Sequence, residues 1–211
     1  YRGNHQSKPF EKALRLYNIP YQISGGGSFF AHSEVKDVIA YMRLLTNPGD
    51  DAAFLRVVNV PRREIGTATL EKLGRYAQGR GIHLLAASAE IGLESILGPP
   101  ALERLRRFAH WVDRMAARTA SDDPLTLVRG MLGELDYDSW LSDTSPSFKA
   151  TERRQQNVQE LIAWLARLVA ESADRNLADL VAHMSLLDII VRQNEARAAD
   201  EVHLMTLHAA Q

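Results

Sequence analysis

The stretch SEVKDVIAYMRLLTNPGDDAAFLRVV, from Ser33 to Val58, decides the fold class of this chain. Its apolar side chains recur at the spacing of one helix face. That stripe consists of Val35, Val38, Ile39, Met42 and Leu45. Ser33 is a suitable N-cap, and Asn-Pro-Gly at 47–49 stops the helix. The aspartates at 50–51 can cap a second helix, which Pro61 ends.

The helical pattern continues through most of the chain. A short amphipathic helix is predicted at 7–17, and longer helices at 67–81, 102–118, 125–135, 150–172 and 177–191. Two of the longer helices have a one-sided apolar face. The first face consists of Leu102, Leu105, Phe108, Ala109, Val112 and Met115. The second consists of Val158, Leu161, Ile162, Leu165, Leu168 and Val169.

Two short strands frame this helical block, one predicted at 20–23 and one at 202–207. Two short strands do not make a stable sheet alone, so they indicate the edges of a neighbouring α/β domain. The fold class predicted is therefore mainly α, with a helical unit at 25–195 inserted between α/β pieces at 1–24 and 196–211. The entry at Gly25, Gly26 and Gly27 favours a hinge, although an ordinary loop is the alternative. The exit is predicted at the polar stretch 193–200.

Composition narrows the class of protein. The 211 residues carry a net charge of -1, contain no cysteine and hold no apolar run long enough to span a membrane. The absence of cysteine excludes a disulfide framework and a cysteine-based zinc site, and it favours a cytoplasmic protein. The lack of a long apolar run argues against a membrane protein. The N-terminus has neither an initiator Met nor a signal peptide, so a fragment of a larger protein is expected.

Catalytic constellations are absent from the sequence. There is no phosphate-binding G-x-x-x-x-G-K-[ST] loop and no H-E-x-x-H, and the histidines are scattered. We therefore predict no catalytic residue, no metal site and no cofactor in this chain.

One stretch, NVPRREIGTATLEKLG, has the features of a phosphate site. Arg62 and Arg63 precede Gly66 and Thr67 at a helix start, where free amides and the helix dipole favour an anion. Such a turn contacts the backbone of a duplex rather than its bases. A plain interhelical turn is the alternative at this point.

Three segments together resemble the UvrD/Rep/PcrA family of superfamily 1 DNA helicases. They are the Tyr-Arg-x-Asn-x-Gln-Ser start, the Gly-Gly-x-x-Phe-Phe segment with its acidic-Lys-Asp helix, and the Thr-Leu-His-Ala strand. The resemblance covers the whole chain, and the middle of the chain is most similar to the Rep branch. It implies an ATP-dependent 3′-to-5′ helicase that acts in bacterial DNA replication. The helical block would be the 2B subdomain, inserted in the second RecA-like domain, 2A.

The resemblance also assigns residues. Arg2 and Asn4 match positions near single-stranded DNA, Thr206 and His208 match a strand at the DNA backbone, and the turn of Arg62, Arg63, Gly66 and Thr67 matches one that grips duplex DNA. Glu64 stands where most of the family has glycine, and its carboxylate should weaken phosphate binding. Gln211 stands where the family has lysine. ATP and Mg²⁺ would bind the parent helicase outside this chain.

Two roles are predicted for this piece. One is an accessory domain that contacts duplex and single-stranded DNA and regulates unwinding by swivelling. The other is a regulatory module that binds replication or repair proteins and has little DNA affinity of its own. The bacterial cytoplasm, in association with the nucleoid, is the expected location.

Overall fold

The computed structural model describes residues 21–24, 29–172, 174–196 and 202–205. The chain divides into two compact units, one formed by Tyr1–His32 with Met184–Gln211 and the other by Ser33–His183. Several predictions fall outside the described residues. These are the helix at 7–17, the DNA contacts of Arg2, Asn4, Thr206 and His208, the hinge at Gly25, Gly26 and Gly27, and the departure at Gln211.

The first unit contains two paired strands, β1 (Tyr21–Ser24) and β2 (Val202–Met205). They run parallel, with Tyr21 opposite Val202 and Ser24 opposite Met205. Both predicted strands are therefore present, and they are neighbours although the whole helical block separates them in sequence. A short 3-10 helix, η2 (Phe29–Ala31), follows in the same unit.

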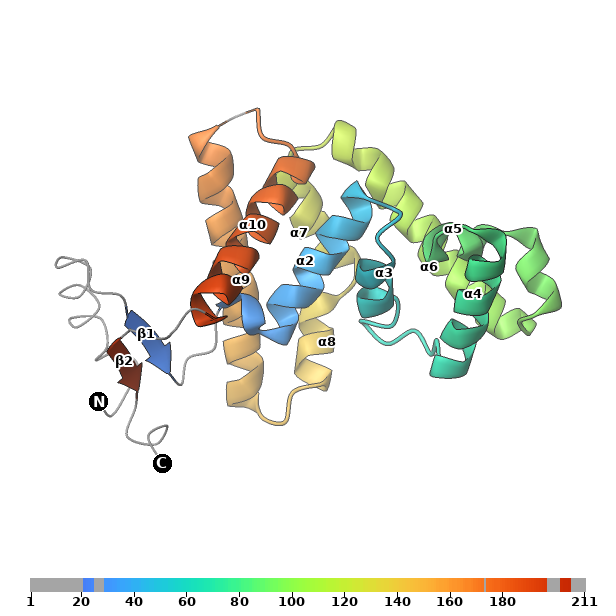
Figure 1. Ribbon diagram of the computed structural model, residues 1–211, viewed down its shortest axis with the longest axis horizontal. Helices are drawn as coiled ribbons and strands as arrows, with labels where there is room; N and C mark the ends of the chain where they lie inside the picture. The colour runs from blue at the N-terminus through green and yellow to red at the C-terminus, as the bar shows by residue number, and fades with distance from the viewer. Residues whose placement is uncertain (1–20, 25–28, 173, 197–201, 206–211) are drawn as a thin grey trace. The chain divides into compact units, whose positions relative to one another are not determined.

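The second unit is built of helices (Figure 1). The first four are α2 (Ser33–Thr46), α3 (Asp51–Val57), α4 (Thr67–Arg80) and α5 (Leu84–Ala89). The 3-10 helix η3 (Ile91–Ser95), α6 (Pro99–Ala117) and the 3-10 helix η4 (Arg118–Ala120) follow. The last are α7 (Pro124–Glu134), α8 (Tyr137–Asp143), α9 (Phe148–Glu171) and α10 (Leu177–Ala196), which begins in this unit. The mainly α prediction is confirmed.

Polar side chains fix where several helices begin. Asp50 accepts a hydrogen bond from the amide of Ala53 at the start of α3, and Asp123 accepts one from the amide of Thr126 at the start of α7. Ser147 does the same for Ala150 at α9. Each cap satisfies an amide that has no partner within its helix. The start of α4 differs, because Gly66 is its N-cap and provides no capping side chain.

The core of the helical unit lies around α2, which packs against α3, α6 and α9. Tyr41, Phe54, Phe108 and Tyr137 are the largest aromatic side chains buried there. The predicted inner face of α6 is buried in full. The predicted stripe of α2 was too narrow, because this helix has neighbours on several sides and also buries Tyr41 and Leu44, whereas Ile39 is only half-buried.

Two features differ from the sequence prediction. The short helices α5 and α8 were not predicted, since six or seven residues give little periodic signal. The predicted exit at 193–200 begins too early, because α10 continues through Ala196. The polar side chains of that stretch do not prevent a helix, since glutamine, glutamate, arginine and alanine all have good helix propensity.

Candidate nucleic-acid interface

The turn between α3 and α4 carries the predicted phosphate site, and its backbone is held from within. The side-chain oxygen of Asn59 accepts hydrogen bonds from the amides of Arg63 (2.7 Å) and Ile65 (3.3 Å). The Ile65 side chain is buried. The turn therefore has a fixed shape, and its two neighbouring arginines face different surroundings.

Arg63 faces the interior of the turn. Its Nη1 lies 3.1 to 3.3 Å from the carbonyl oxygens of Val57, Val58, Val60 and Pro61. Its Nη2 donates to the hydroxyl of Tyr41 at 2.9 Å, and the guanidinium carbon lies 4.8 Å from the centre of the Phe108 ring. A guanidinium so engaged has few donors left for a phosphate. The structure thus argues against the phosphate contact predicted for Arg63 and gives it a bracing role.

Tyr41 completes this brace. Its hydroxyl donates to the carbonyl oxygens of Val57 (3.2 Å) and Val60. Burial raises the pKa of Tyr41 to about 12, although the positive charge of Arg63 acts in the opposite direction. The hydroxyl therefore keeps its proton at neutral pH and remains a donor.

The outer side of the turn presents Arg62, Glu64, Gly66 and Thr67, which are all exposed. Arg62 has no acidic partner among the residues that the structure describes. Gly66 has φ −76° and ψ 166°, an extended conformation open to any residue. A Cβ on Gly66 would meet no atom within 4 Å. Neither conformation nor internal packing requires glycine here, so the space above it is free for an external group.

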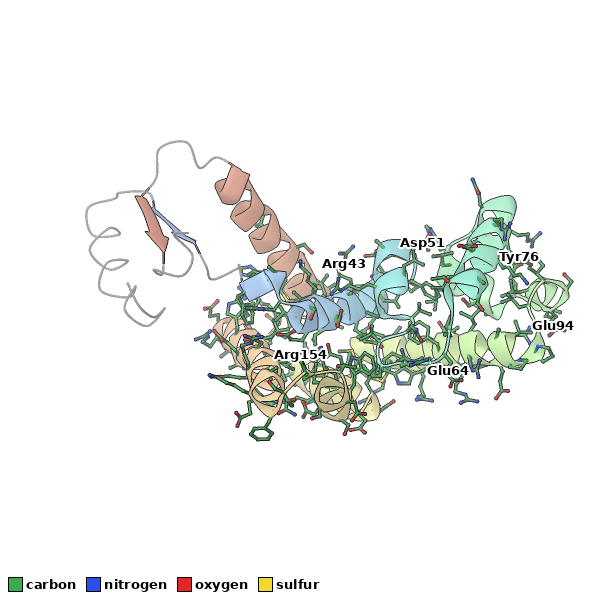
Figure 2. All side chains as sticks on the ribbon, turned by 90° about the horizontal axis from the view of Figure 1, so that it is seen from below. Arg43, Asp51, Glu64, Tyr76, Glu94 and Arg154 are labelled. Carbon is green, nitrogen blue, oxygen red and sulfur yellow. The ribbon has the colours of Figure 1, made fainter. Side chains whose placement is uncertain are left out.

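Glu64 has a different backbone conformation. Its φ is 55°, in the left-handed region that favours glycine. The carboxylate forms an ion pair with Arg104 of α6, with Nη2 and Oε2 2.5 Å apart. Nη1 of Arg104 also lies 3.4 Å from the backbone carbonyl oxygen of Glu64. Figure 2 shows Glu64 beside the long ribbon of α6.

A hollow of about 540 Å³ lies between the turn and α6. Among the residues that line it are Arg62, Glu64, Arg104, Arg107, Trp111 and Glu134. Arg107 pairs with Glu103 on its own helix, while Glu134 accepts from Trp111 and Arg114. The arginines of α6 are therefore largely neutralised by carboxylates. Arg63 also lines the hollow and has no carboxylate partner there, but its guanidinium is engaged by backbone carbonyls and Tyr41, so Arg62 is the exposed arginine of the hollow without a partner among the described residues.

A larger hollow of about 1080 Å³ runs along another side of α6. Its lining includes Leu97, Pro99 and Leu102, together with Arg106, which pairs with Glu94. Pro99 begins α6 after the N-cap Gly98, which provides no capping side chain, but Pro99 and Pro100 have no amide hydrogen to donate to a phosphate. We therefore regard the smaller hollow, beside the turn, as the better candidate for binding a phosphate backbone.

A buried polar network lies at the start of α2 and was not predicted from the sequence. Glu34 accepts hydrogen bonds from Asn157 (2.6 Å) and Ser33 (3.1 Å), and lies 3.6 Å from Arg154. Asp37, one turn later, pairs with Arg56 (2.7 Å) and accepts from the hydroxyl of Tyr137 (3.2 Å). These contacts join α2 to α3, α8 and α9. Acidic residues on an otherwise apolar helix face were the available sequence signal.

The pKa values of the two carboxylates of this network are shifted in opposite directions. Burial opposes ionisation of Glu34, but the hydrogen bonds from Asn157, its own backbone and Ser33 outweigh it and lower its pKa below the ordinary value. Burial raises the pKa of Asp37 above its ordinary value, against the attraction of Arg56. Both are thus perturbed by packing, and neither faces an open site.

The described residues form neither a metal site nor a membrane span. No group of three or more histidine, aspartate or glutamate side chains there is arranged to hold a metal ion. None of the described helices is long and apolar enough to cross a membrane.

Comparison with known proteins gives a consistent pattern. Residues 1–94 match the UvrD-like helicase C-terminal domain. The chain is 46% identical to the ATP-dependent DNA helicase Rep of Escherichia coli over 213 aligned residues, which cover all of this chain and 32% of that protein. It is 36% identical to DNA helicase II of Escherichia coli and 30% identical to the ATP-dependent DNA helicase PcrA of Bacillus subtilis, covering 29% of each. The chain spans about a third of the length of the relatives it matches.

Proposed function

We propose that this chain is part of a UvrD-like helicase, and that its helical unit is an accessory subdomain that grips duplex DNA within an ATP-dependent DNA helicase. The relatives are named as DNA helicases, and this chain spans only part of their length. Helicase activity, ATP and Mg²⁺ therefore belong, in this proposal, to the longer protein. DNA contact is the part of the function that we assign to the chain itself.

The observation that carries the proposal is the exposed start of α4, with Arg62 beside it. The first amides of a helix have no partner within the helix, and here no side chain caps them. The glycine at this start leaves room for a ligand to approach. A phosphate would find free amides, the positive end of a helix dipole and a guanidinium together.

The inner residues of the turn support this role indirectly. Arg63, Asn59 and Tyr41 hold the backbone, so the amides at the start of α4 keep one direction without a ligand. A site held ready in this way loses less conformational freedom on binding. Because it offers no groups suited to base edges, binding should be nearly independent of sequence.

Duplex binding by the purified protein tests the proposal. The affinity for a short fluorescent duplex would be measured by anisotropy over a range of salt concentrations. Arg62→Ala should weaken binding by roughly three- to tenfold at low salt, and should reduce the slope of log K against log salt by about 0.9. Two unrelated duplex sequences should respond equally.

A matched control is available on α9. Arg153 is exposed and lies outside the hollow, so Arg153→Ala removes the same charge and should leave both affinity and slope close to those of the unaltered protein. Gly66→Ala should weaken binding without lowering the melting temperature. If Arg62→Ala and Arg153→Ala have the same effect, the turn is not the contact.

Other parts of the proposed function rest on the family alone. Contacts to single-stranded DNA by Arg2, Asn4, Thr206 and His208, and a hinge at Gly25, Gly26 and Gly27, lie outside the described residues. Swivelling of the helical unit against the rest of the chain is likewise proposed from the family resemblance. We expect no ATP hydrolysis by this chain alone, since the sequence lacks a nucleotide-binding loop. DNA-stimulated phosphate release above a matched blank would contradict this.

A second candidate function is the binding of replication or repair proteins. It is favoured by large apolar side chains on the surface of the helical unit, since Ile91 and Phe148 are each nearly four-fifths exposed. Isolated apolar residues are common on protein surfaces, however, and these two do not identify a binding partner. Duplex binding that is absent at low salt would favour this second candidate over the first.

A further inference from the structure

Glu64 combines two unusual properties. It is one of two non-glycine residues with positive φ in the described part of the chain, the other being Asp136. It also introduces a negative charge two residues before Gly66, the N-cap of the helix start that is proposed to bind phosphate. A residue in an unfavourable conformation at a binding surface suggests a function, because the conformation alone would favour glycine.

The ion pair of Glu64 and Arg104 is accessible from solvent. The Glu64 side chain is 65% exposed and that of Arg104 is 38% exposed. The backbone on either side of Glu64 is held separately, through Asn59 and the buried Ile65. The carboxylate can therefore leave Arg104 without the turn losing its shape.

The guanidinium of Arg104 can bind a phosphate as well as a carboxylate. Both anions offer two oxygens to the guanidinium fork, so one can replace the other. Arg104 lines the same hollow as Arg62, next to the turn. A duplex backbone lying over the start of α4 would place a phosphate where it can compete with the Glu64 carboxylate for Arg104.

We propose that Glu64 is a built-in competitor of DNA, which holds Arg104 in the free protein and gives it up to a backbone phosphate when duplex DNA binds. This inference rests on the proposed function. Arg104 is then a DNA contact that neither the turn motif nor the family resemblance assigned. The exchange makes binding weaker than the number of arginines implies, because the ion pair of Arg104 with Glu64 must break before Arg104 can pair with a phosphate.

A purely structural ion pair is the competing explanation. Exposed pairs of this kind contribute little to stability, and the strained backbone of Glu64 adds a cost that such a pair hardly offsets. If the ion pair had only a structural role, a substitution that removes the charge of Glu64 and keeps its shape would leave DNA binding unchanged. The two explanations can therefore be separated by substitutions that are close in shape.

The test is a double-substitution cycle in duplex binding, with Glu64→Gln, Arg104→Gln and both together. Glu64→Gln should tighten binding by about three- to tenfold at low salt and steepen the salt slope by about 0.9, because Arg104 becomes available. Arg104→Gln alone should change affinity less than about twofold, since in the unaltered protein the phosphate contact that Arg104 gains is offset by the ion pair with Glu64 that it loses. In the double variant most of the gain from Glu64→Gln should disappear.

The control is Glu160→Gln on α9, which removes the same charge from an exposed position outside the hollow and should leave affinity unchanged.

If the effects of Glu64→Gln and Arg104→Gln on the binding free energy are additive, Glu64 acts by repulsion only and the exchange is refuted. An equal gain on single-stranded DNA of the same length would refute the assignment to a duplex backbone. If no variant binds duplex at all, the proposed function fails as well. If binding depends on Arg62 but not on Glu64, the proposed function stands and the competitor does not.

Discussion

The helical unit contains two clusters of acidic and basic residues that differ in burial. At the start of α2, Glu34 is 5% exposed beside Arg154, and Asp37 is 10% exposed beside Arg56. At the turn before α4, Glu64 is 65% exposed beside Arg104. Figure 2 shows Arg154 and Glu64 well apart along the unit.

This difference shows that pairs of carboxylate and arginine side chains have different roles when they are buried and when they are exposed. In the first cluster every carboxylate has partners on other helices, so the charges hold the fold together. In the second cluster the ion pair is open to solvent, where charge attraction is screened and partners can be exchanged. Arg62 and Arg63 repeat the contrast within two adjacent residues, since one is exposed and the other braces the turn.

The largest effect on stability is expected from the inner arginine of the turn. Arg63→Ala removes the donor to the carbonyl oxygens of Val58 and Pro61 and to the Tyr41 hydroxyl, and should lower the free energy of unfolding by about 3 kcal/mol. Arg63→Lys should restore only part of this, because an ammonium group cannot reproduce the planar fork. Urea denaturation measures both, with Arg62→Ala as the control that changes stability by less than about 0.5 kcal/mol. Equal losses from Arg62 and Arg63 would remove the distinction between the two sides of the turn.

The buried cluster should give two opposite pH dependences. The folded pKa of Asp37 is raised, so its contribution is fully present below its ordinary pKa of 3.8 and is lost as the pH rises through the folded value. The folded pKa of Glu34 is lowered, so its contribution is present above its ordinary pKa of 4.5 and is lost as the pH falls through the folded value.

Unfolding by urea at a series of acidic pH values measures this contrast. Relative to the unaltered protein, Glu34→Gln should lose most stability at neutral pH and progressively less as the pH falls. Asp37→Asn should remove a component that weakens the fold as the pH rises above 3.8, although it also loses the pairing with Arg56. Parallel profiles for Glu34→Gln and Asp37→Asn would contradict the opposite shifts.

A smaller effect is expected at the backbone of Glu64. Glu64→Gly and Glu64→Ala both remove the ion pair with Arg104, but only glycine adopts the left-handed conformation without strain. The glycine variant should therefore be more stable than the alanine variant by about 1 kcal/mol. Thermal unfolding of the two variants compares them directly. The reverse order would mean that the turn relaxes when the carboxylate is removed.

The sequence predicted those parts of the fold that have a strong local signal. The inner face of α6 was predicted residue by residue, because this helix buries one side and exposes the other. The cap at Asp50 follows from residue type alone. The burial of α2 was underestimated, since α6 and α9, which are distant in sequence, cover it in addition to the neighbouring α3. The helices α5 and α8 are too short to show a period.

The sequence predicted where the candidate site lies, but not how its side chains are oriented or paired. The run from Arg62 to Thr67 indicated a phosphate-binding turn, and the unfavourable charge of Glu64 was expected. Which of two adjacent arginines faces inward depends on Tyr41 and Phe108, which only the fold brings to the turn. The partner of Glu64 is 40 residues away on α6, beyond the reach of any local pattern.

The central claim is that the outer side of the turn meets duplex DNA while the inner side does not. The most direct measurement is a duplex titration followed by the NMR signals of the arginine Nε–Hε groups, each assigned through its own substitution. The signals of Arg62 and Arg104 should shift with added duplex, and those of Arg63 and the control Arg153 should stay in place. A shift of Arg63 with no change at Arg62 would contradict the account.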